Sequence, residues 1–152
     1  MRESRISVRR FQTGDEPLLV EILRLNGQYG SPIVDGPEAM RRIAECAAAE
    51  FLVAEEDGSP VGFVRGVYDG SRALIHQLSV HPRHQGNGIG SRLVREICQV
   101  FAARGSPTLS ATVTSNSVGF WEKVGFQRLE VFLVLTDADN VLGRREGSAA
   151  AD

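Results

Sequence analysis

The chain has 152 residues, of which 42% are hydrophobic and 24% charged, so it can form one globular domain but not two ordinary ones. A net charge of −2 argues against nucleic-acid or anionic-membrane partners. The first residues contain no apolar signal segment, and the longest strongly apolar run, at 131–135, is too short to span a bilayer. We therefore expect a cytoplasmic protein.

The two cysteines, Cys46 and Cys98, have neither a disulfide framework nor metal-ligand spacing around them. Each falls on the apolar stripe of a predicted helix, so we expect both to be small buried hydrophobic residues.

The first half of the chain alternates strand-like and helical segments. Four strands, bounded by turn residues, are predicted at 6–12, 51–57, 60–68 and 73–80. Two helices, at 15–27 and 37–50, lie between the first and second strands and are joined by a loop at 30–37. The second and third strands form a hairpin through Asp57 and Gly58.

The second half predicts a helix, a strand, a short helix and a last strand, at 90–104, 108–114, 118–125 and 127–135. The strands at 73–80 and 108–114 should be parallel, because a long helix connects them. Residues 1–136 are thus expected to form a single domain. A polar, flexible tail should follow at 137–152.

The stretch "SVHPRHQGNGIGSRLV", at 79–94, places Gly86, Gly88 and Gly90 immediately before a helix. The first turn of a helix has unpaired N–H groups and a partial positive charge, and glycines let a ligand approach the backbone. This arrangement favours a phosphate-binding loop over a merely flexible turn. A P-loop lysine is missing, and the spacing differs from that of a dinucleotide fingerprint.

The stretch resembles the Q/R-x-x-G-x-G/A motif of the GCN5-related N-acetyltransferase superfamily, with Gln85, Gly88 and Gly90 at the motif positions. "NSVGFWEKVGF", at 116–126, resembles that superfamily's Asn…Phe-Tyr-x-x-x-Gly-Phe element, and the likeness extends from Ile6 to Leu135. It implies an α/β fold: a mixed, mostly antiparallel sheet with a splayed parallel strand pair, flanked by about four helices.

The resemblance implies that acetyl-coenzyme A is the cosubstrate and that no metal is needed. Its diphosphate would lie on the backbone amides of Gln85, Gly86, Asn87, Gly88, Ile89, Gly90 and Ser91. Its pantetheine arm would run along Leu78, Ser79 and Val80, where a bulge would free an amide for the oxyanion, and Asn116 would lie nearby. The implied reaction is direct attack of a primary amine on the thioester in a ternary complex.

His76 stands where many relatives carry a glutamate, and an imidazole can accept a proton at neutral pH. We expect it to be the general base, although it could instead only line the cleft. Trp121 stands where the family often places a tyrosine as general acid, and an indole cannot supply that proton. Water could protonate the leaving thiolate, and Ser115 or Ser117 could serve as hydrogen-bond donors.

The acceptor should enter near the loop between the first two helices, where Tyr29 could pack against it and Asp35 could pair with its ammonium group, unless both are ordinary loop residues. A small-molecule amine is the expected acceptor. The alternatives are a non-catalytic acyl-coenzyme A sensing domain and a protein N-acetyltransferase acting on a lysine or an N-terminus. Analogy with the superfamily allows a homodimer.

Overall fold

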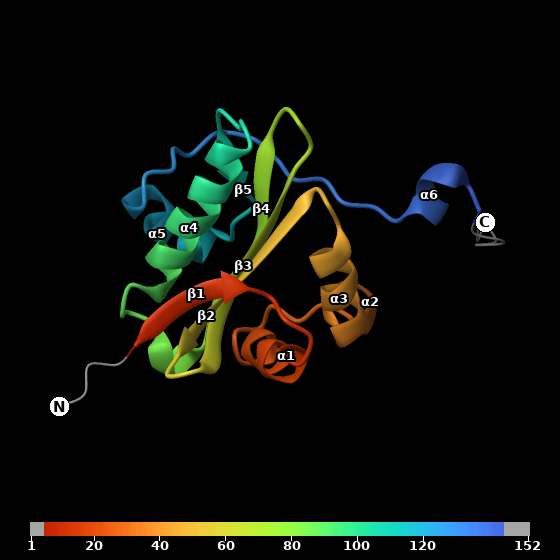
Figure 1. The fold of residues 1–152 in the computed structure, drawn as a ribbon. Coiled ribbons are helices and arrows are strands. Elements are labelled where there is room, and N and C mark those ends of the chain that lie inside the picture. Colours follow the sequence, from red (N-terminus) through yellow and green to blue (C-terminus); the bar gives the residue numbers. More distant parts are fainter. Residues whose placement is uncertain (1–4, 145–152) are drawn as a thin grey trace.

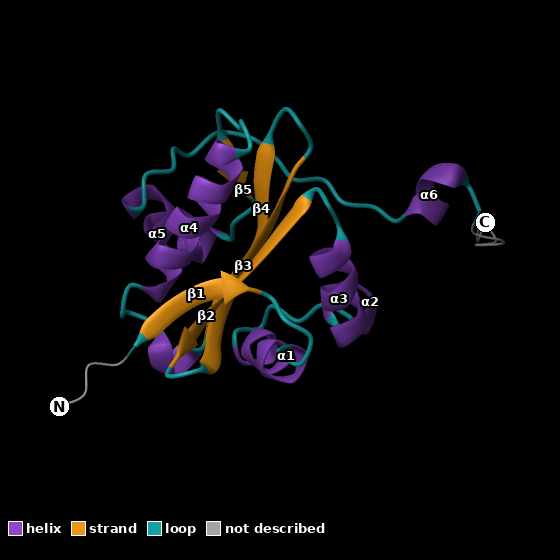
Figure 2. Cartoon of the chain, viewed as in Figure 1, coloured by secondary structure: helices purple, strands orange, loops and turns teal. Residues whose placement is uncertain are grey.

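The computed structural model describes residues 5–144 as one five-stranded sheet with helices on both faces (Figures 1 and 2). The strands, in chain order and in sheet order alike, are β1 (Ile6–Arg10), β2 (Ala49–Glu56), β3 (Ser59–Tyr68), β4 (Ala73–Val80) and β5 (Leu109–Ala111). Neighbouring strands are antiparallel except β4 and β5, which are parallel. The expected mixed sheet with one parallel pair is confirmed.

Six α-helices lie within the described residues: α1 (Glu16–Leu25), α2 (Pro32–Asp35), α3 (Pro37–Glu45), α4 (Ile89–Ala103), α5 (Val118–Lys123) and α6 (Ala138–Leu142). Short 3₁₀ turns at 82–84 and 115–117 precede α4 and α5. The helices predicted at 15–27, 90–104 and 118–125 correspond to α1, α4 and α5.

Two hydrophobic layers flank the sheet, because successive strand residues point to opposite faces. In β2, Leu52 and Ala54 pack toward α4 and α5, whereas Phe51 and Val53 pack toward α1 and α3. The buried stripe of α4 is Ile89, Leu93, Val94, Ile97 and Phe101. This places the start of α4 beside the end of β4.

An ion pair fixes the connection between β1 and α1. Arg9 donates to both carboxylate oxygens of Asp15 over 2.8 and 2.9 Å, and to Glu55 over 2.9 Å. Burial raises the pKa of Asp15, but hydrogen bonds from Arg9 and from the N–H of Gln12 outweigh it, so the pKa lies below its ordinary value. Asp15 is therefore charged in the folded state.

Two local expectations in the first half were wrong. The predicted loop at 30–37 contains the single-turn helix α2, and the helix predicted at 37–50 ends at Glu45. Cys46 is extended beyond that end and is exposed, not buried. Cys98 is exposed as well, because it lies beside the buried stripe of α4 on a side that no other element covers within residues 5–144.

The last predicted strand, at 127–135, was also wrong. These residues are unpaired in the structure and leave the body along the far side of β5 (Figure 1). The short β5 offers little edge to pair with, and the run from Val131 to Leu135 is apolar on both faces, whereas an exposed edge strand normally has one polar face. The expected tail begins with α6, capped by the Asp137 side chain, and its residues 145–152 lie outside the described part of the chain.

Candidate active site

The candidate site begins where β4 and β5 separate. β5 pairs with β4 only through Ala73, Leu74 and Ile75, so from His76 to Val80 this edge of β4 has no strand neighbour among the described residues. We call the space beside this edge the β4–β5 wedge. It confirms the splayed parallel pair.

The peptide groups of Leu78 and Val80 face the β4–β5 wedge. Ser79 pairs with Phe63 of β3, and alternation along a strand therefore turns its two neighbours outward. The carbonyl of Leu78 accepts from the Gln28 side chain over 3.2 Å. The carbonyl of Val80 accepts two hydrogen bonds, one from the Asn26 side chain over 2.8 Å and one from the Gln85 side chain over 2.9 Å. Side-chain amides from the segment after α1 and from the start of the glycine loop thus border the wedge.

Beyond β4, the glycine loop leads into α4 with its backbone open. Gly86 and Gly88 have φ of +81° and +80°, and nothing lies within 4 Å of a Cβ built on either. Gly88 is the N-cap, no side chain caps the helix, and the first turn holds no acidic residue. The first intrahelical bond runs from the Arg92 N–H to the Gly88 carbonyl over 3.0 Å. The preceding amides can therefore bind an anion.

Gly90 serves a different purpose from the other two glycines. A Cβ at this position would lie 3.3 Å from Cζ of Phe120 and 3.8 Å from Cγ2 of Val80. Its missing side chain makes room for the packing of Phe120 and Val80. The loop is further held by the side chains before it, since His84 Nδ1 lies 2.8 Å from a carboxylate oxygen of Glu56.

His76 is the first residue of the wedge and the extra residue of a β-bulge. Arg65 pairs with Gln77 and Gly66 with Ile75, so His76 has no partner on β3. A bulge can redirect a side chain next to an active site. His76 is exposed, but partial loss of solvent around its imidazole and, to a smaller extent, the positive charge of Arg65 lower its pKa below the ordinary value of 6.5. The imidazole is therefore neutral, and able to accept a proton, at neutral pH.

Next to His76, a polar cluster ties the loop after α1 to the sheet. Asp35, only 7% exposed, accepts from the Gly30 N–H over 2.7 Å and from the Gln77 side chain over 3.4 Å, and lies 3.9 Å from an Arg65 nitrogen. Arg65 in turn donates to Gln77 over 3.0 Å. Since both oxygens of Asp35 contact protein donors, the geometry favours a positioning role over direct pairing with a substrate.

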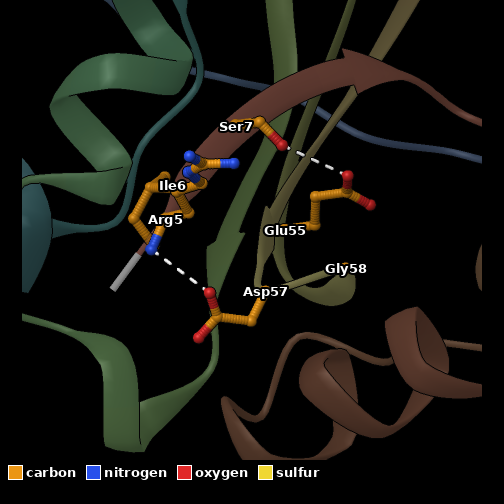
Figure 3. Close-up of a pocket in the computed structure, with 6 residues that line it drawn as sticks. All are labelled: Arg5, Ile6, Ser7, Glu55, Asp57 and Gly58. Atoms are coloured by element: carbon orange, nitrogen blue, oxygen red, sulfur yellow. Dashed lines mark hydrogen bonds between the residues drawn. The ribbon is translucent and has the colours of Figure 1, made fainter. Parts of the chain in front are cut away.

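A separate shallow pocket lies at the β1–β2 end of the sheet, lined by Arg5, Ile6, Ser7, Glu55, Asp57 and Gly58 (Figure 3). Its polar groups satisfy one another: Ser7 donates to Glu55 over 3.2 Å, and the Arg5 N–H donates to Asp57 over 3.4 Å. The two carboxylates make it unsuitable for a phosphate. The described residues contain no group of three side chains suited to a metal ion and no helix that could span a membrane.

Residues 19–126, more than half of the chain, match the sequence model of the "Acetyltransferase (GNAT) family". The chain belongs to this family. The motif that carried the resemblance, from Gln85 to Gly90, lies inside the match, whereas the apolar run at 131–135 lies outside it.

Individual relatives agree with this membership. An acetyltransferase of Yersinia pestis (strain Pestoides F) is 34% identical over 87 residues, which are 55% of this chain and 62% of the relative, so less than two thirds of that relative is covered. A transcriptional regulator from Bacillus halodurans C-125 superposes with a TM-score of 0.74 at 25% identity, over 88% of this chain and all of its own. PaiA N-acetyltransferase from Thermoplasma acidophilum, solved with coenzyme A, shares the fold with a TM-score of 0.73 at 22% identity, over 84% of this chain and 93% of its own.

In this GNAT protein, the second motif belongs to the core more than to the wedge. Trp121 is 7% exposed and packs edge-on against Phe120 and Phe126, with ring centroids 5.3 and 5.0 Å away. This burial favours a packing role for the residue at the family's tyrosine position. Asn116 is exposed in the turn before α5, where its side-chain oxygen lies 2.5 Å from the Thr114 hydroxyl.

Of the other candidates, Tyr29 has its ring centroid 4.4 Å from Cζ of the Arg24 guanidinium. The same ring packs against the hydrophobic cluster beside α1 and α3. The Ser117 hydroxyl donates to the Thr114 carbonyl over 2.9 Å, which holds it in the turn. Sequence reasoning missed Arg65, Gln77, Asn26 and Gln28, because their importance depends on which strand edge they reach.

Proposed function

We propose that this GNAT protein transfers the acetyl group of acetyl-coenzyme A to the primary amine of a small molecule. One observation carries the proposal: the amides before and within the first turn of α4 are open where Gly86 and Gly88 have positive φ and free space beside them. Such a turn suits a diphosphate, which can accept several N–H groups and meets the positive end of a long helix.

The amides from Gln85 to Ser91 would hold the diphosphate. The wedge-facing peptide groups of Leu78 and Val80 would pair with the carrier's arm, as the family resemblance implies. Their carbonyls already attract side-chain donors from Asn26, Gln28 and Gln85, which supports the view that this edge accepts hydrogen bonds from outside the sheet. A wedge-facing N–H would stabilise the negative charge that develops on the thioester oxygen.

His76 would act as the base, directly or through water. The amine nitrogen attacks the carbonyl carbon, the carbon–sulfur bond breaks, and the proton lost from nitrogen passes to the neutral imidazole. A lowered pKa keeps His76 unprotonated at neutral pH, although it also makes the imidazole a weaker base. The leaving thiolate resembles that of cysteine, with a pKa of about 8.5, so water can protonate it without a tyrosine.

The contacts that hold the segment between α1 and α3, where the acceptor is expected to enter, favour a small acceptor. The Asp35 cluster and the Gln28 side chain fix the segment between α1 and α3 against β4. A segment fixed in this way is better suited to a compact amine than to an extended polypeptide. We propose that Asp35 is a positioning residue here and that Tyr29 contributes an apolar wall.

A thiol-release assay tests the proposal. The protein is mixed with acetyl-coenzyme A and either a panel of small primary amines or peptides that carry a lysine or a free N-terminus. Turnover of a small amine is expected. Turnover of peptides alone would support a protein N-acetyltransferase, and coenzyme binding without any thiol release would support a sensing domain. A melting temperature that coenzyme A does not change would contradict the binding site itself.

A further inference from the structure

Arg65 of β3 is a largely buried cation whose guanidinium is only partly satisfied. Its side chain is 19% exposed, yet within residues 5–144 it donates a single hydrogen bond, from Nε to the Gln77 side chain over 3.0 Å. Nη2 lies 3.9 Å from Oδ1 of Asp35, which is beyond hydrogen-bond distance. Both terminal nitrogens remain accessible, because the described residues contain no enclosed side-chain nitrogen without a hydrogen bond. The guanidinium therefore keeps its terminal N–H groups for a ligand.

Arg9, on β1 of the same sheet, shows what a satisfied guanidinium looks like. It is 24% exposed and donates from all three nitrogens to the carboxylates of Asp15 and Glu55, over 2.8 and 2.9 Å. The hydrogen bond to Asp15 and then that to Glu55 raise the pKa of Arg9 above its ordinary value, against the effect of burial. Burial lowers the pKa of Arg65 instead, because the charge of Asp35 does not offset it. The cation of Arg65 thus lacks a close anionic partner.

Arg65 lies on the side of the sheet where the acceptor is expected to enter. It follows Phe63 by two positions, so both side chains point to the face that α1 and α3 cover, away from α4 (Figure 1). Asp35, at the end of α2, lies beside its guanidinium. Across the strand pair, Arg65 stands opposite Gln77, the residue after His76. After the loss of solvent, the charge of Arg65 is the second cause that lowers the pKa of His76, so one small molecule can reach both groups.

A carboxylate is the anion that suits this guanidinium best. Arginine binds a carboxylate through two parallel N–H···O bonds, and the terminal nitrogens of Arg65 supply the free N–H groups. A phosphate would bring a second negative charge near Asp35, which lies 3.9 Å from the same guanidinium. A neutral group would leave the desolvated cation without the charge that it lacks.

We propose that Arg65 selects the acceptor: the amine substrate also carries a carboxylate, which binds the terminal nitrogens of the Arg65 guanidinium and directs the amine toward His76. The acceptor is then an amino acid or another short amino carboxylate. Asp35 and Gln77 are positioning residues, since they hold the guanidinium without occupying all of its donors. This inference rests on the proposed function, because it names the acceptor class for the same site.

Matched acceptors test the proposal on the unaltered protein. Each standard amino acid, β-alanine and γ-aminobutyrate are compared with their own carboxamides in the thiol-release assay. The amide keeps the amine but lacks the negative charge, and it loses its amine proton more readily, so amine basicity cannot produce a preference for the acid. We expect kcat/KM to be about 10²-fold higher for at least one acid than for its amide. Equal or higher values for every amide would overturn the proposal.

Substitution of the guanidinium tests whether Arg65 causes that preference. Arg65→Gln should bring the ratio of acid to amide to about one, through a higher KM for the acid. Arg42→Gln is the control, because Arg42 is an exposed arginine of α3, and this variant should keep the full preference. A preference that persists in Arg65→Gln would contradict the proposal.

Two measurements guard against a loss of folding in Arg65→Gln. Acetyl-coenzyme A should still raise the melting temperature of this variant, which shows that it is folded. Arg65→Lys keeps the charge without the planar fork and should keep only part of the preference for the acid. If Arg65→Gln does not fold, an undiminished preference in Arg65→Lys would overturn the proposal.

Direct binding separates this inference from the proposed function. Calorimetry on the protein saturated with coenzyme A measures acceptor affinity without turnover, and an acid should bind more tightly than its amide in the parent protein but not in Arg65→Gln. If the acid binds in this way and no amine releases thiol, the proposed function fails and the Arg65 site stands. If neutral amines release thiol and no acid binds more tightly than its amide, the proposed function stands and this inference fails.

Phosphoethanolamine, compared with ethanolamine, distinguishes a phosphate from a carboxylate. We expect its advantage over ethanolamine in kcat/KM to be smaller than that of the best amino acid over its amide. A larger advantage, lost in Arg65→Gln, would show that Arg65 binds a phosphate and would overturn the carboxylate assignment.

Discussion

Gly90 and Phe120 connect the two motifs of the chain: a Cβ at Gly90 would lie 3.3 Å from Cζ of Phe120. The glycine that opens α4 and the aromatic residue of α5 are therefore packed against each other. This contact fixes the start of α4 relative to the second motif, so that the phosphate loop depends on a ring more than 25 residues further along.

A double-mutant cycle measures that contact. Gly90→Ala should destabilise the protein more when Phe120 is present than in a Phe120→Ala background, because the ring must shift to admit the methyl group. We expect a coupling free energy of about 1 kcal/mol from urea unfolding, within the range for residues in contact. Strictly additive effects would mean that the ring yields at no cost.

The glycine loop is tested by Gly88→Glu. A carboxylate there should repel a diphosphate, so the rise in melting temperature that acetyl-coenzyme A produces should disappear. Gly70→Glu is a matched control: Gly70 also has positive φ, +98°, with nothing within 4 Å of an added Cβ, but lies at the opposite end of β4. The control should lose a similar amount of stability and keep the ligand response. Equal responses in both variants would contradict the site.

The pH profile tests His76. Because its folded pKa lies below 6.5, the neutral, active form persists at neutral pH, and kcat/KM should fall only in more acidic solution. His76→Ala should lower kcat/KM by about 10²-fold, the lower end of what general bases contribute, and remove this acid limb. His76→Gln keeps a polar side chain without a titrating group, and its kcat/KM should fall as it does in His76→Ala. An unchanged profile in both variants would remove His76 from the mechanism.

The Arg9–Asp15 pair predicts an acid-sensitive contribution to stability. The lowered pKa of Asp15 means that the folded state favours the carboxylate, so this contribution is complete above about pH 4, near the unfolded pKa, and is lost as pH falls through the folded pKa. Asp15→Asn should cost about 3 kcal/mol at neutral pH, as when one partner of a buried pair is removed. Glu96→Gln is the control, since its exposed pair with Arg92 should contribute less than about 1 kcal/mol. Urea unfolding at neutral and acidic pH measures the free energy of unfolding of both variants. Equal losses of stability in Asp15→Asn and Glu96→Gln would contradict a special role for Asp15.

Trp121 can be examined with two aromatic replacements. If Trp121 serves packing, Trp121→Tyr and Trp121→Phe should both lower the melting temperature and change kcat by a similar, small factor. If a phenolic proton limits the rate at this position, Trp121→Tyr alone should increase kcat. Steady-state kinetics together with thermal unfolding separates the two roles.

The amino-acid sequence by itself determined the order of elements up to α5 except for the single-turn α2, the parallel β4–β5 pair and the glycine loop. These features depend on local signals, namely alternation in β4, the 3.6-residue stripe of α4 and glycines where φ is positive. The family resemblance rested on the same residues. The hairpin turn at Asp57 and Gly58 and the ends of α1 and α4 were predictable for the same reason, whereas the end of α3 was not.

Tertiary structure alone decided the rest. The packing of Phe120 against Gly90 and the contact of the Gln77 side chain with Asp35 are examples, since each joins residues at least 30 positions apart. The segment 127–135 reads as a strand, yet a strand exists only where an edge and a covering layer are available, and this chain alone offers neither. Contacts between residues distant in the sequence set these outcomes, and a linear pattern does not contain them.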